Sequence, residues 1–135
     1  MAGGFIGGLG WWNAPVGFYW GVEMSRFSCP CCQVDGMDRL AVLAFLALEE
    51  EFGSTLLVTS AYRCDRHNTE VGGTHGSRHM QGIAFDISMA KASQPKLLLL
   101  ARKHGFHGIG VAPHFVHIDM RGTESSWTYQ NGVAS

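Results

Sequence analysis

The chain has 135 residues, 46% of them hydrophobic, and 10 Lys and Arg against 11 Asp and Glu leave a net charge of −1. This size and composition predict a single soluble domain with a core of its own. No run of Lys or Arg appears in the chain. Nucleic acid is therefore excluded as the main partner, because phosphate binding needs a clustered basic surface.

Residues 1–24 are rich in glycine and aromatic side chains, and Glu23 is their only charged residue. A secretory signal would have a basic start and a continuous aliphatic segment, and neither is recognisable here. Asn13, Pro15 and the glycines interrupt the apolar stretch before it reaches the roughly 20 residues that a membrane span needs. We predict an extended arm that packs on the domain or contacts a partner. An atypical export or membrane-contact segment is the alternative, and the localisation stays open.

The four cysteines are Cys29, Cys31, Cys32 and Cys64. The first three stand too close together for the usual zinc knuckle, which has two separated cysteine pairs. Three interpretations stay open: buried thiols, one disulfide between the 29–32 segment and Cys64, or a second, structural metal. The sequence does not decide their redox state.

The first predicted helix covers residues 37–52, where apolar side chains recur with a period of 3.6. Further apolar residues widen this surface, so we expect the helix to be buried on most sides. Gly53 is a suitable C-cap, and we expect the acidic residues 49–51 before it to be solvated. The residues of the predicted stripe are Leu40, Leu43, Ala44, Ala47 and Leu48.

The remaining predicted elements are shorter. Residues 60–76 indicate a polar loop with one helical turn, and Ser93 is expected to cap the second helix. Two helices with several short strands predict an α+β domain whose small sheet is mostly antiparallel. We place this domain at residues 25–121 and a C-terminal tail at 122–135. The expected elements are a buried strand at 55–59, a strand at 83–88, a helix at 94–104, and strands at 106–111 and 115–120 joined by a turn around Pro113.

Three side chains from separate segments predict a metal site. Strand alternation places Asp86 on the small-residue face, away from Phe85 and Ile87. His79 from the preceding loop and His117 from a later strand can reach the same point. Two imidazoles and one carboxylate leave a coordination position open, as in catalytic zinc sites. The plain alternative is three ordinary polar residues, but a carboxylate among apolar neighbours is costly to bury without a cation.

The order Ser77-x-His79-x-x-Gly82-x-Ala84-x-Asp86 resembles the signature of the zinc D-Ala-D-Ala carboxypeptidase family of peptidoglycan peptidases. It is also similar to the related zinc fold of the hedgehog signalling domain. The resemblance runs in order through residues 25–121. The other segments that carry it are Phe27-x-Cys29-x-Cys31-Cys32, Ser60-Ala61-Tyr62-Arg63-Cys64, Asn68, Gly72-Gly73, Gly108-Ile109-Gly110 and Phe115-Val116-His117-Ile118-Asp119.

This resemblance implies a hedgehog/DD-peptidase-like zinc fold with one Zn²⁺. His79, Asp86 and His117 would be its ligands. The resemblance also implies that Arg63 holds a substrate carboxylate or carbonyl, and a guanidinium fork suits that task. We predict Ser77 and Gln81 as further substrate-binding residues.

The general base is less well defined by the sequence. Many relatives carry an acid three residues before the last zinc ligand, and this chain has His114 there. An imidazole, with an ordinary pKa near 6.5, suits proton transfer at neutral pH, so we predict His114 as the base. A solvated turn histidine is the alternative. Asp119 shares a strand face with His117, and we predict a supporting role for it at the site, with a surface acid as the alternative.

Together these features predict a zinc metallopeptidase that hydrolyses peptide bonds of bacterial peptidoglycan. It would act as a D-Ala-D-Ala carboxypeptidase or as an endopeptidase on the stem or cross-bridge. The lack of a wall-binding repeat and of a clear signal is compatible with a phage-encoded lysin or a virion-associated peptidase. Residues 1–24 would then contact the virion or a partner. A non-catalytic zinc-binding module of a cell wall or a phage is the alternative, because no acid occupies the usual position of the base.

Overall fold

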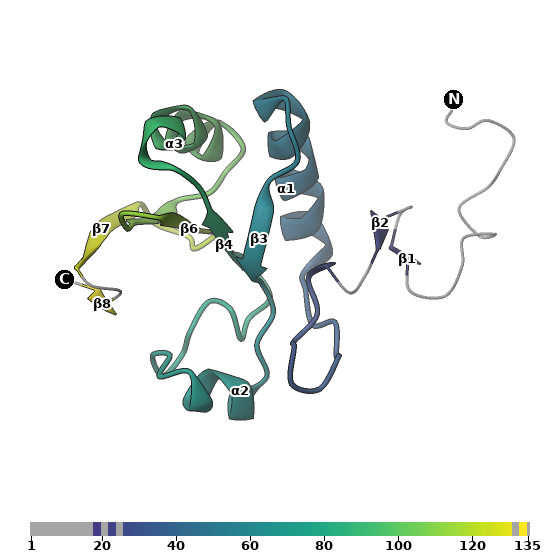
Figure 1. The fold of residues 1–135 in the computed structure, drawn as a ribbon. Coiled ribbons are helices and arrows are strands. Elements are labelled where there is room, and N and C mark those ends of the chain that lie inside the picture. Colours follow the sequence, from purple (N-terminus) through teal and green to yellow (C-terminus); the bar gives the residue numbers. More distant parts are fainter. Residues whose placement is uncertain (1–17, 20–21, 24–25, 131–132, 135) are drawn as a thin grey trace, which may run out of the picture.

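The computed structural model describes residues 18–19, 22–23, 26–130 and 133–134 (Figure 1). The predicted arm, residues 1–24, therefore lies mostly outside the described residues. Its two described pieces, β1 (Phe18–Tyr19) and β2 (Val22–Glu23), form an antiparallel pair. No helix in the described part of the chain is long and apolar enough to cross a membrane.

The centre of the molecule is a mixed sheet of six strands in the order β3-β4-β6-β5-β7-β8. Every neighbouring pair is antiparallel except β5 and β7, which run parallel. The predicted α+β class with a mostly antiparallel sheet is thus confirmed. The strands are β3 (Leu57–Ser60), β4 (Ala84–Ser88), β5 (Gly108–Val111), β6 (Phe115–Asp119), β7 (Ser125–Gln130) and β8 (Val133–Ala134).

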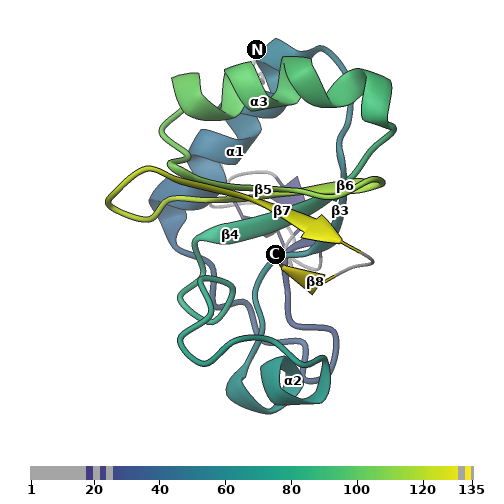
Figure 2. The ribbon, with the colours of Figure 1, turned by 90° about the vertical axis from the view of Figure 1, so that its left-hand side faces the viewer.

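Two of the helices cover one face of this sheet, while the third lies beyond the opposite face (Figure 2). The covering helices are α1 (Arg39–Phe52) and α3 (Gln94–Lys103), the latter preceded by a 3₁₀ turn at Lys91–Ser93. On the other side, α2 (Asp65–Glu70) and its flanking loops form a separate layer, which we call the α2 lobe and define as residues 62–82. The sheet is therefore sandwiched between an apolar helical layer and a polar lobe.

Strand alternation divides the side chains between these two layers. Phe85 and Ile87 of β4 and Ile118 of β6 are fully buried on the helical side. There the Phe85 ring stacks on Phe45 of α1 with a centroid separation of 4.5 Å. The intervening residues, Asp86 among them, face the α2 lobe. The apolar core thus fixes the strands whose other face carries polar side chains.

The helix ends follow partly from the sequence. Asp38 caps α1 by accepting a hydrogen bond from the Ala41 N–H at 3.1 Å. The predicted C-cap is confirmed, since Gly53 has a left-handed φ of 94° and its N–H donates to the Glu49 carbonyl. The predicted capping by Ser93 is wrong, because its side chain makes no cap hydrogen bond and its backbone already belongs to the 3₁₀ turn.

Three further expectations are corrected by the structure. Leu40 and Leu43 are 70% and 43% exposed, because α1 buries its adjacent face through Ala41, Val42, Phe45 and Leu48. β3 is an edge strand rather than a buried one, and Leu57 is 64% exposed. The segment predicted as a tail from residue 122 instead supplies β7, which pairs with β5 inside the sheet.

Candidate metal centre

One row of residues across the sheet carries two of the predicted metal ligands. Asp86 of β4 lies directly opposite His117 of β6, and His117 in turn lies opposite Gly110 of β5. Directly opposed residues of an antiparallel pair have their side chains close together on the same face. The strand register alone therefore brings the Asp86 carboxylate to the His117 ring.

The third predicted ligand comes from the α2 lobe. A tight turn carries His79, and the buried Ser77 hydroxyl accepts a hydrogen bond from the His79 N–H at 3.2 Å. The Arg63 N–H donates to the His79 carbonyl at 3.2 Å, which ties this turn to the chain leaving β3. His79 is thus positioned by polar contacts, in contrast to the two residues on the strands.

These three side chains converge on one point. One nitrogen of His79, one of His117 and one oxygen of Asp86 all lie within 4.8 Å of one another. The His117 Nδ1 is 2.9 Å and the His79 Nε2 3.3 Å from the same Asp86 oxygen, Oδ1. Tetrahedral bonds of about 2.0–2.1 Å would place ligand atoms roughly 3.3 Å apart. The donor set and its spacing therefore fit a zinc ion.

The far nitrogen of each imidazole has a partner that fixes the tautomer. The His79 Nδ1 lies 2.7 Å from the Ala61 carbonyl oxygen, to which it must donate, so Nε2 is left as the lone-pair nitrogen. The His117 Nε2 lies 2.7 Å from Asp119 Oδ2, which leaves Nδ1 to face Asp86 and the metal position. A metal-bound histidine is usually held in this way by a carbonyl or a carboxylate. This arrangement is what a metal site requires of its histidines.

Asp119 is itself held rigidly, in keeping with the predicted supporting role. Its side chain is fully buried, and Arg121 donates to it from Nε and Nη2, both at 2.8 Å. Gly108 on the neighbouring strand makes room for this pair, because a Cβ there would lie 2.2 Å from Asp119 Oδ1. A chain of contacts thus runs from Arg121 through Asp119 to His117.

The charges at the site shift the pKa values in opposite directions. Burial alone would raise the pKa of the Asp86 carboxyl, but the adjoining His117 and His79 rings outweigh it and hold that pKa well below its usual range. Burial would lower the pKa of His117, but hydrogen bonds to Asp119 and Asp86 outweigh it and raise that pKa. The site therefore keeps an ionised carboxylate facing two imidazoles, an environment that favours a bound cation.

Arg63 lies beside the metal position and is largely engaged by neighbours. Its Nη2 is 3.3 Å from Asp86 Oδ2, the oxygen that does not face the histidines. Its Nε donates to Ser60 at 3.1 Å and its Nη1 to Asn68 at 3.3 Å. In this structure Arg63 thus orients the Asp86 carboxylate, a task that its predicted substrate-binding role does not include.

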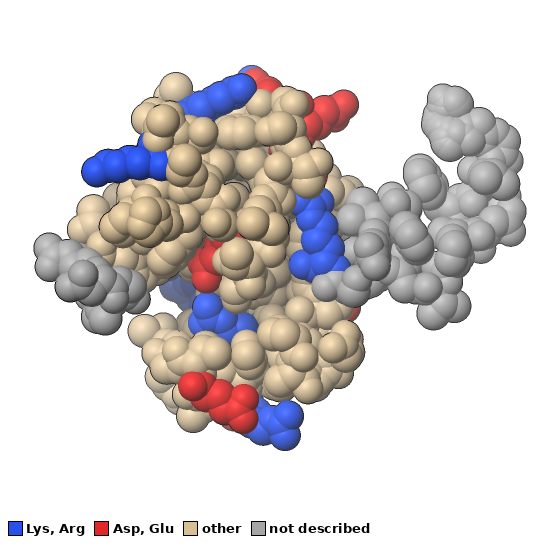
Figure 3. Space-filling view, viewed as in Figure 1, with Lys and Arg blue, Asp and Glu red and all other residues tan. Residues whose placement is uncertain are grey.

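A cleft of about 840 Å³ opens over this site between the sheet and the α2 lobe. Figure 3 shows acidic and basic groups meeting in a hollow on this face of the molecule. Three arginines line the cleft: Arg63, Arg78 and Arg121. Arg78 is the one of the three whose side chain has no hydrogen bond or ion pair with another described residue. It is thus available to an anionic ligand.

Sequence reasoning missed several residues of this cleft. Arg78 lies inside the quoted signature, between Ser77 and His79, but was not singled out. Trp127 and Tyr129 of β7 also line the cleft, and the Trp127 ring lies 5.3 Å from the His117 ring. Their alternation with Ser126 and Thr128 is a strand signal that would have predicted both β7 and the face that they share.

The other predicted site residues occupy different places. Ser77 lines the cleft, but its hydroxyl is used to hold the turn that carries His79. Gln81 is exposed and is not among the residues that line the cleft. His114 is exposed in the turn between β5 and β6, also outside the cleft lining. The structure therefore brings together the three predicted ligands, Arg63 and Ser77, with Asp119 behind His117, and leaves Gln81 and His114 aside.

The chain was compared with known protein families and with curated proteins. A family model described as Peptidase M15 matches residues 23–119, which is well over half of the chain. No curated protein matches the chain. The matched range includes all three residues that converge at the metal position.

Proposed function

We propose that this chain, which belongs to the peptidase M15 family of zinc peptidases, hydrolyses peptide bonds of bacterial peptidoglycan with one Zn²⁺ held by His79, Asp86 and His117. The observation that carries the proposal is the convergence of two imidazoles and one carboxylate whose outer atoms are all held by partners. Such a site presents three ligands and leaves a coordination position for water or substrate. Zinc bound there would polarise the scissile carbonyl and activate a water molecule.

The residues of the chain supply orientation around this centre. The Ala61 carbonyl and Asp119 fix the two imidazoles, and Arg63 fixes the carboxylate from the opposite oxygen. Each ligand is thus held in its productive geometry before a metal or a substrate arrives. This preorganisation supports a catalytic centre, because it lowers the reorganisation needed during reaction.

The lining of the cleft supports a peptide substrate that carries carboxylates. Arg78 has no partner among the described residues, so it can form a bidentate pair with a free carboxylate. Peptidoglycan stem peptides carry such groups at their ends and along their side chains. Trp127 and Tyr129 add aromatic side chains to the lining of the cleft. Arg78, together with Arg63 as predicted, is our proposed substrate-binding pair.

The general base is a role for which the cleft offers no unengaged carboxylate or imidazole among its described residues. A base must reach the proton that it removes, directly or through one water, although contacts can tighten when substrate binds. His114 lies in an exposed turn outside the cleft lining, so its position does not support the predicted role. Among described residues of the cleft, each carboxylate and imidazole is already engaged at the metal position. His114→Ala is therefore included in the test below.

The test is zinc-dependent digestion of purified peptidoglycan, followed by detection of new amino groups and of released D-Ala. Asp86→Asn should reduce cleavage by at least about 100-fold, and removal of zinc should have the same effect. Asp65→Asn, an exposed acid-to-amide change on α2, is the matched control and should leave cleavage unchanged. Release of free D-Ala would assign a carboxypeptidase, and new amino groups without it an endopeptidase.

Three variants divide the roles. Arg78→Gln should raise KM more than it lowers kcat, while Arg102→Gln on α3 should change neither. His114→Ala should lower kcat only if it acts as the base. Zinc binding without cleavage of any muropeptide would contradict the peptidase proposal and favour the non-catalytic zinc-binding module. Origin from a phage, as a lysin or a virion-associated peptidase, stays a prediction from the resemblance.

A further inference from the structure

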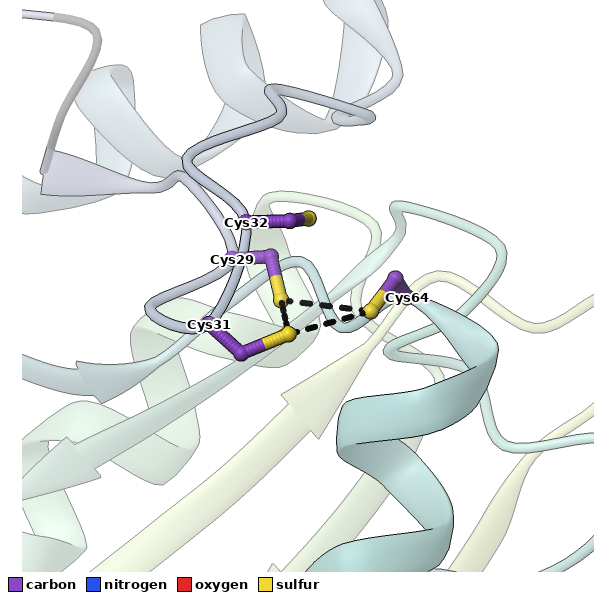
Figure 4. Close-up of side chains that lie close together, drawn as sticks. All are labelled: Cys29, Cys31, Cys32 and Cys64. Carbon is purple, nitrogen blue, oxygen red and sulfur yellow. Dashed lines mark hydrogen bonds between the residues drawn. The ribbon is translucent and has the colours of Figure 1, made fainter.

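A second group of side chains suited to a metal lies apart from the peptidase site. The sulfur atoms of Cys29, Cys31 and Cys64 form a triangle whose edges measure 3.3, 3.5 and 3.7 Å (Figure 4). Cys32 projects from the same turn, and its sulfur lies within 4.8 Å of the others. All four cysteines of the chain therefore meet at one place.

The backbone brings these cysteines together in two steps. Between residues 29 and 34 the chain makes a tight turn, in which the Cys29 N–H donates to the Val34 carbonyl and the Gln33 N–H to the Cys29 carbonyl. Gln33 has a left-handed φ of 65°, a conformation that costs energy for a residue with a side chain. The Tyr62 N–H then donates to the Phe27 carbonyl at 3.1 Å, which places Cys64 beside the turn.

These sulfur separations have a simple chemical meaning. A disulfide bond would place two sulfurs about 2.05 Å apart, much closer than any pair here. Four thiolates bound to one zinc ion at about 2.3 Å lie roughly 3.8 Å from one another at the corners of a tetrahedron. The three measured edges come close to this value. We propose that Cys29, Cys31, Cys32 and Cys64 bind one structural Zn²⁺ as a tetrathiolate site.

The surroundings of the sulfurs suit this ion. Four thiolates and one Zn²⁺ carry a net charge of −2, which needs donors and positive charge nearby. The His67 N–H donates to the Cys64 sulfur at 3.4 Å. The Arg66 guanidinium, two residues after Cys64, lies close enough to the Cys31 sulfur to interact with it electrostatically. Sulfur-only tetrahedral donor sets select zinc or iron–sulfur clusters, and a site this compact holds a single ion.

The place of the site in the fold explains what the ion would do. Residues 62–82, the α2 lobe, contain no buried apolar side chain, since the core passes from Ala61 directly to Ala84. A segment that buries so little apolar surface needs another source of stability. Zinc would fasten the 29–34 turn to the start of α2. Arg63 directly precedes the proposed ligand Cys64, and it contacts both Asp86 and the turn that carries His79. The second ion would thereby hold the lobe against the peptidase site.

The experiment uses the full chain, purified with zinc and without chelator. An Asp86→Asn/His117→Ala double variant removes the first metal site, so its zinc content reports on the cysteines alone. We expect about one zinc per chain in this variant and about two in the wild type. The four thiols should resist a thiol reagent until a chelator removes the metal. Replacement of zinc by Co²⁺ in the double variant should give sulfur-to-cobalt charge-transfer absorption.

The ligand role of Cys32, the outermost of the four, is tested separately. Cys32→Ser should weaken zinc binding at this site by at least about tenfold, while Cys32→His should preserve it, because zinc accepts three cysteines and one histidine. Both variants keep the other three sulfurs in place.

Absence of zinc and of the cobalt absorption in the double variant would overturn the proposal. Fewer than four titratable thiols in denatured, unreduced protein would do the same, because it would show a disulfide. These outcomes are independent of peptidoglycan cleavage by the wild type. Failure of the cysteine site is therefore distinguishable from failure of the proposed function.

Discussion

The helical layer and the α2 lobe lie on opposite faces of one sheet, and different interactions stabilise them. The helical layer buries large apolar side chains such as Phe45, Phe85 and Leu97 completely. The α2 lobe, residues 62–82, buries only polar side chains, namely Asn68, Ser77 and His79. Hydrophobic burial thus holds one layer, while hydrogen bonds and proposed metal ions hold the other.

This difference explains where the peptidase site lies. The sheet contributes Asp86 and His117, which are fixed by strand register and by the core behind them. The lobe contributes His79 and Arg63, which are held by polar contacts, and Arg78, whose side chain has no such contact with another described residue. A half that is fixed by the apolar core and a half that is held by polar contacts meet at one cleft. The metal position lies where these two halves meet.

The largest expected effect comes from the helical layer. Phe85→Ala removes a fully buried ring that stacks on Phe45, and we expect a loss of about 3–5 kcal/mol in the free energy of unfolding. Val71→Ala in the α2 lobe, where the side chain is 52% exposed, should change it by less than about 0.5 kcal/mol. Urea unfolding measures both. Similar losses for the two variants would mean that the layers are not stabilised differently.

The next effect concerns the link between the core and the metal. Asp119→Asn keeps the shape of the side chain but removes the charge that Arg121 and His117 share. We expect zinc affinity at the peptidase site to fall by about 10–100-fold, measured by competition with a chelator in a chain with the cysteine site blocked. An unchanged affinity would show that Asp119 does not orient His117. Gly108→Ala should weaken the affinity as well, because its Cβ would displace Asp119.

A smaller effect on the free energy of unfolding is expected at the ion pair between Arg26, which precedes α1, and Glu49 of α1. Burial alone would raise the pKa of Glu49, but hydrogen bonds from Arg26 and the Leu56 N–H lower it below its ordinary value of about 4.5. The stabilisation is therefore present above that value and is lost as pH falls through the lower, folded-state pKa. Glu49→Gln should cost about 1 kcal/mol at pH 7 and progressively less below pH 4.5. Glu50→Gln, a change of an exposed acid on the same helix, is the control. If Glu49→Gln cost the same free energy of unfolding at every pH, the Arg26–Glu49 ion pair would be excluded as the source of the stabilisation.

The smallest effect belongs to the surface of the lobe. Arg66 and Glu70 lie 4.0 Å apart on successive turns of α2 and are mostly exposed. Such pairs contribute about 0.3–0.5 kcal/mol at most. Glu70→Gln should therefore change the free energy of unfolding by less than about 0.5 kcal/mol, as followed by thermal or urea unfolding. A loss above about 1 kcal/mol would show that ordinary ion pairs, without metal, hold the lobe.

The parts of the fold that the sequence predicted well are those set by strand alternation. The pattern around Asp86 and that around His117 each fix one apolar and one polar face, and the core confirms both. The burial of α1 was predicted less well. Its sequence is apolar around most of the helix, so periodicity could not choose between the stripe of Leu40 and the stripe of Phe45. Contact with the sheet selects the second.

The parts that the sequence could not predict depend on contacts between distant segments. His114 stands three residues before His117, but an odd spacing along a strand leads to the opposite face, and the strand begins only at Phe115. His114 is therefore close to His117 in the sequence but does not reach the metal position. The alternation in β7 indicates a strand, but no local pattern predicts that this strand pairs in parallel with β5. The meeting of Cys64 with the 29–32 turn likewise depends on the long-range contact between Tyr62 and Phe27.

Anomalous X-ray scattering of a zinc-loaded crystal, recorded on both sides of the zinc absorption edge, tests both proposed metal sites directly. We expect one zinc peak about 2.0–2.2 Å from ligand atoms of His79, Asp86 and His117, and a second peak about 2.3 Å from the four cysteine sulfurs. The first peak would place a catalytic metal between the sheet and the α2 lobe. A zinc-loaded crystal with no peak among His79, Asp86 and His117 would contradict the account.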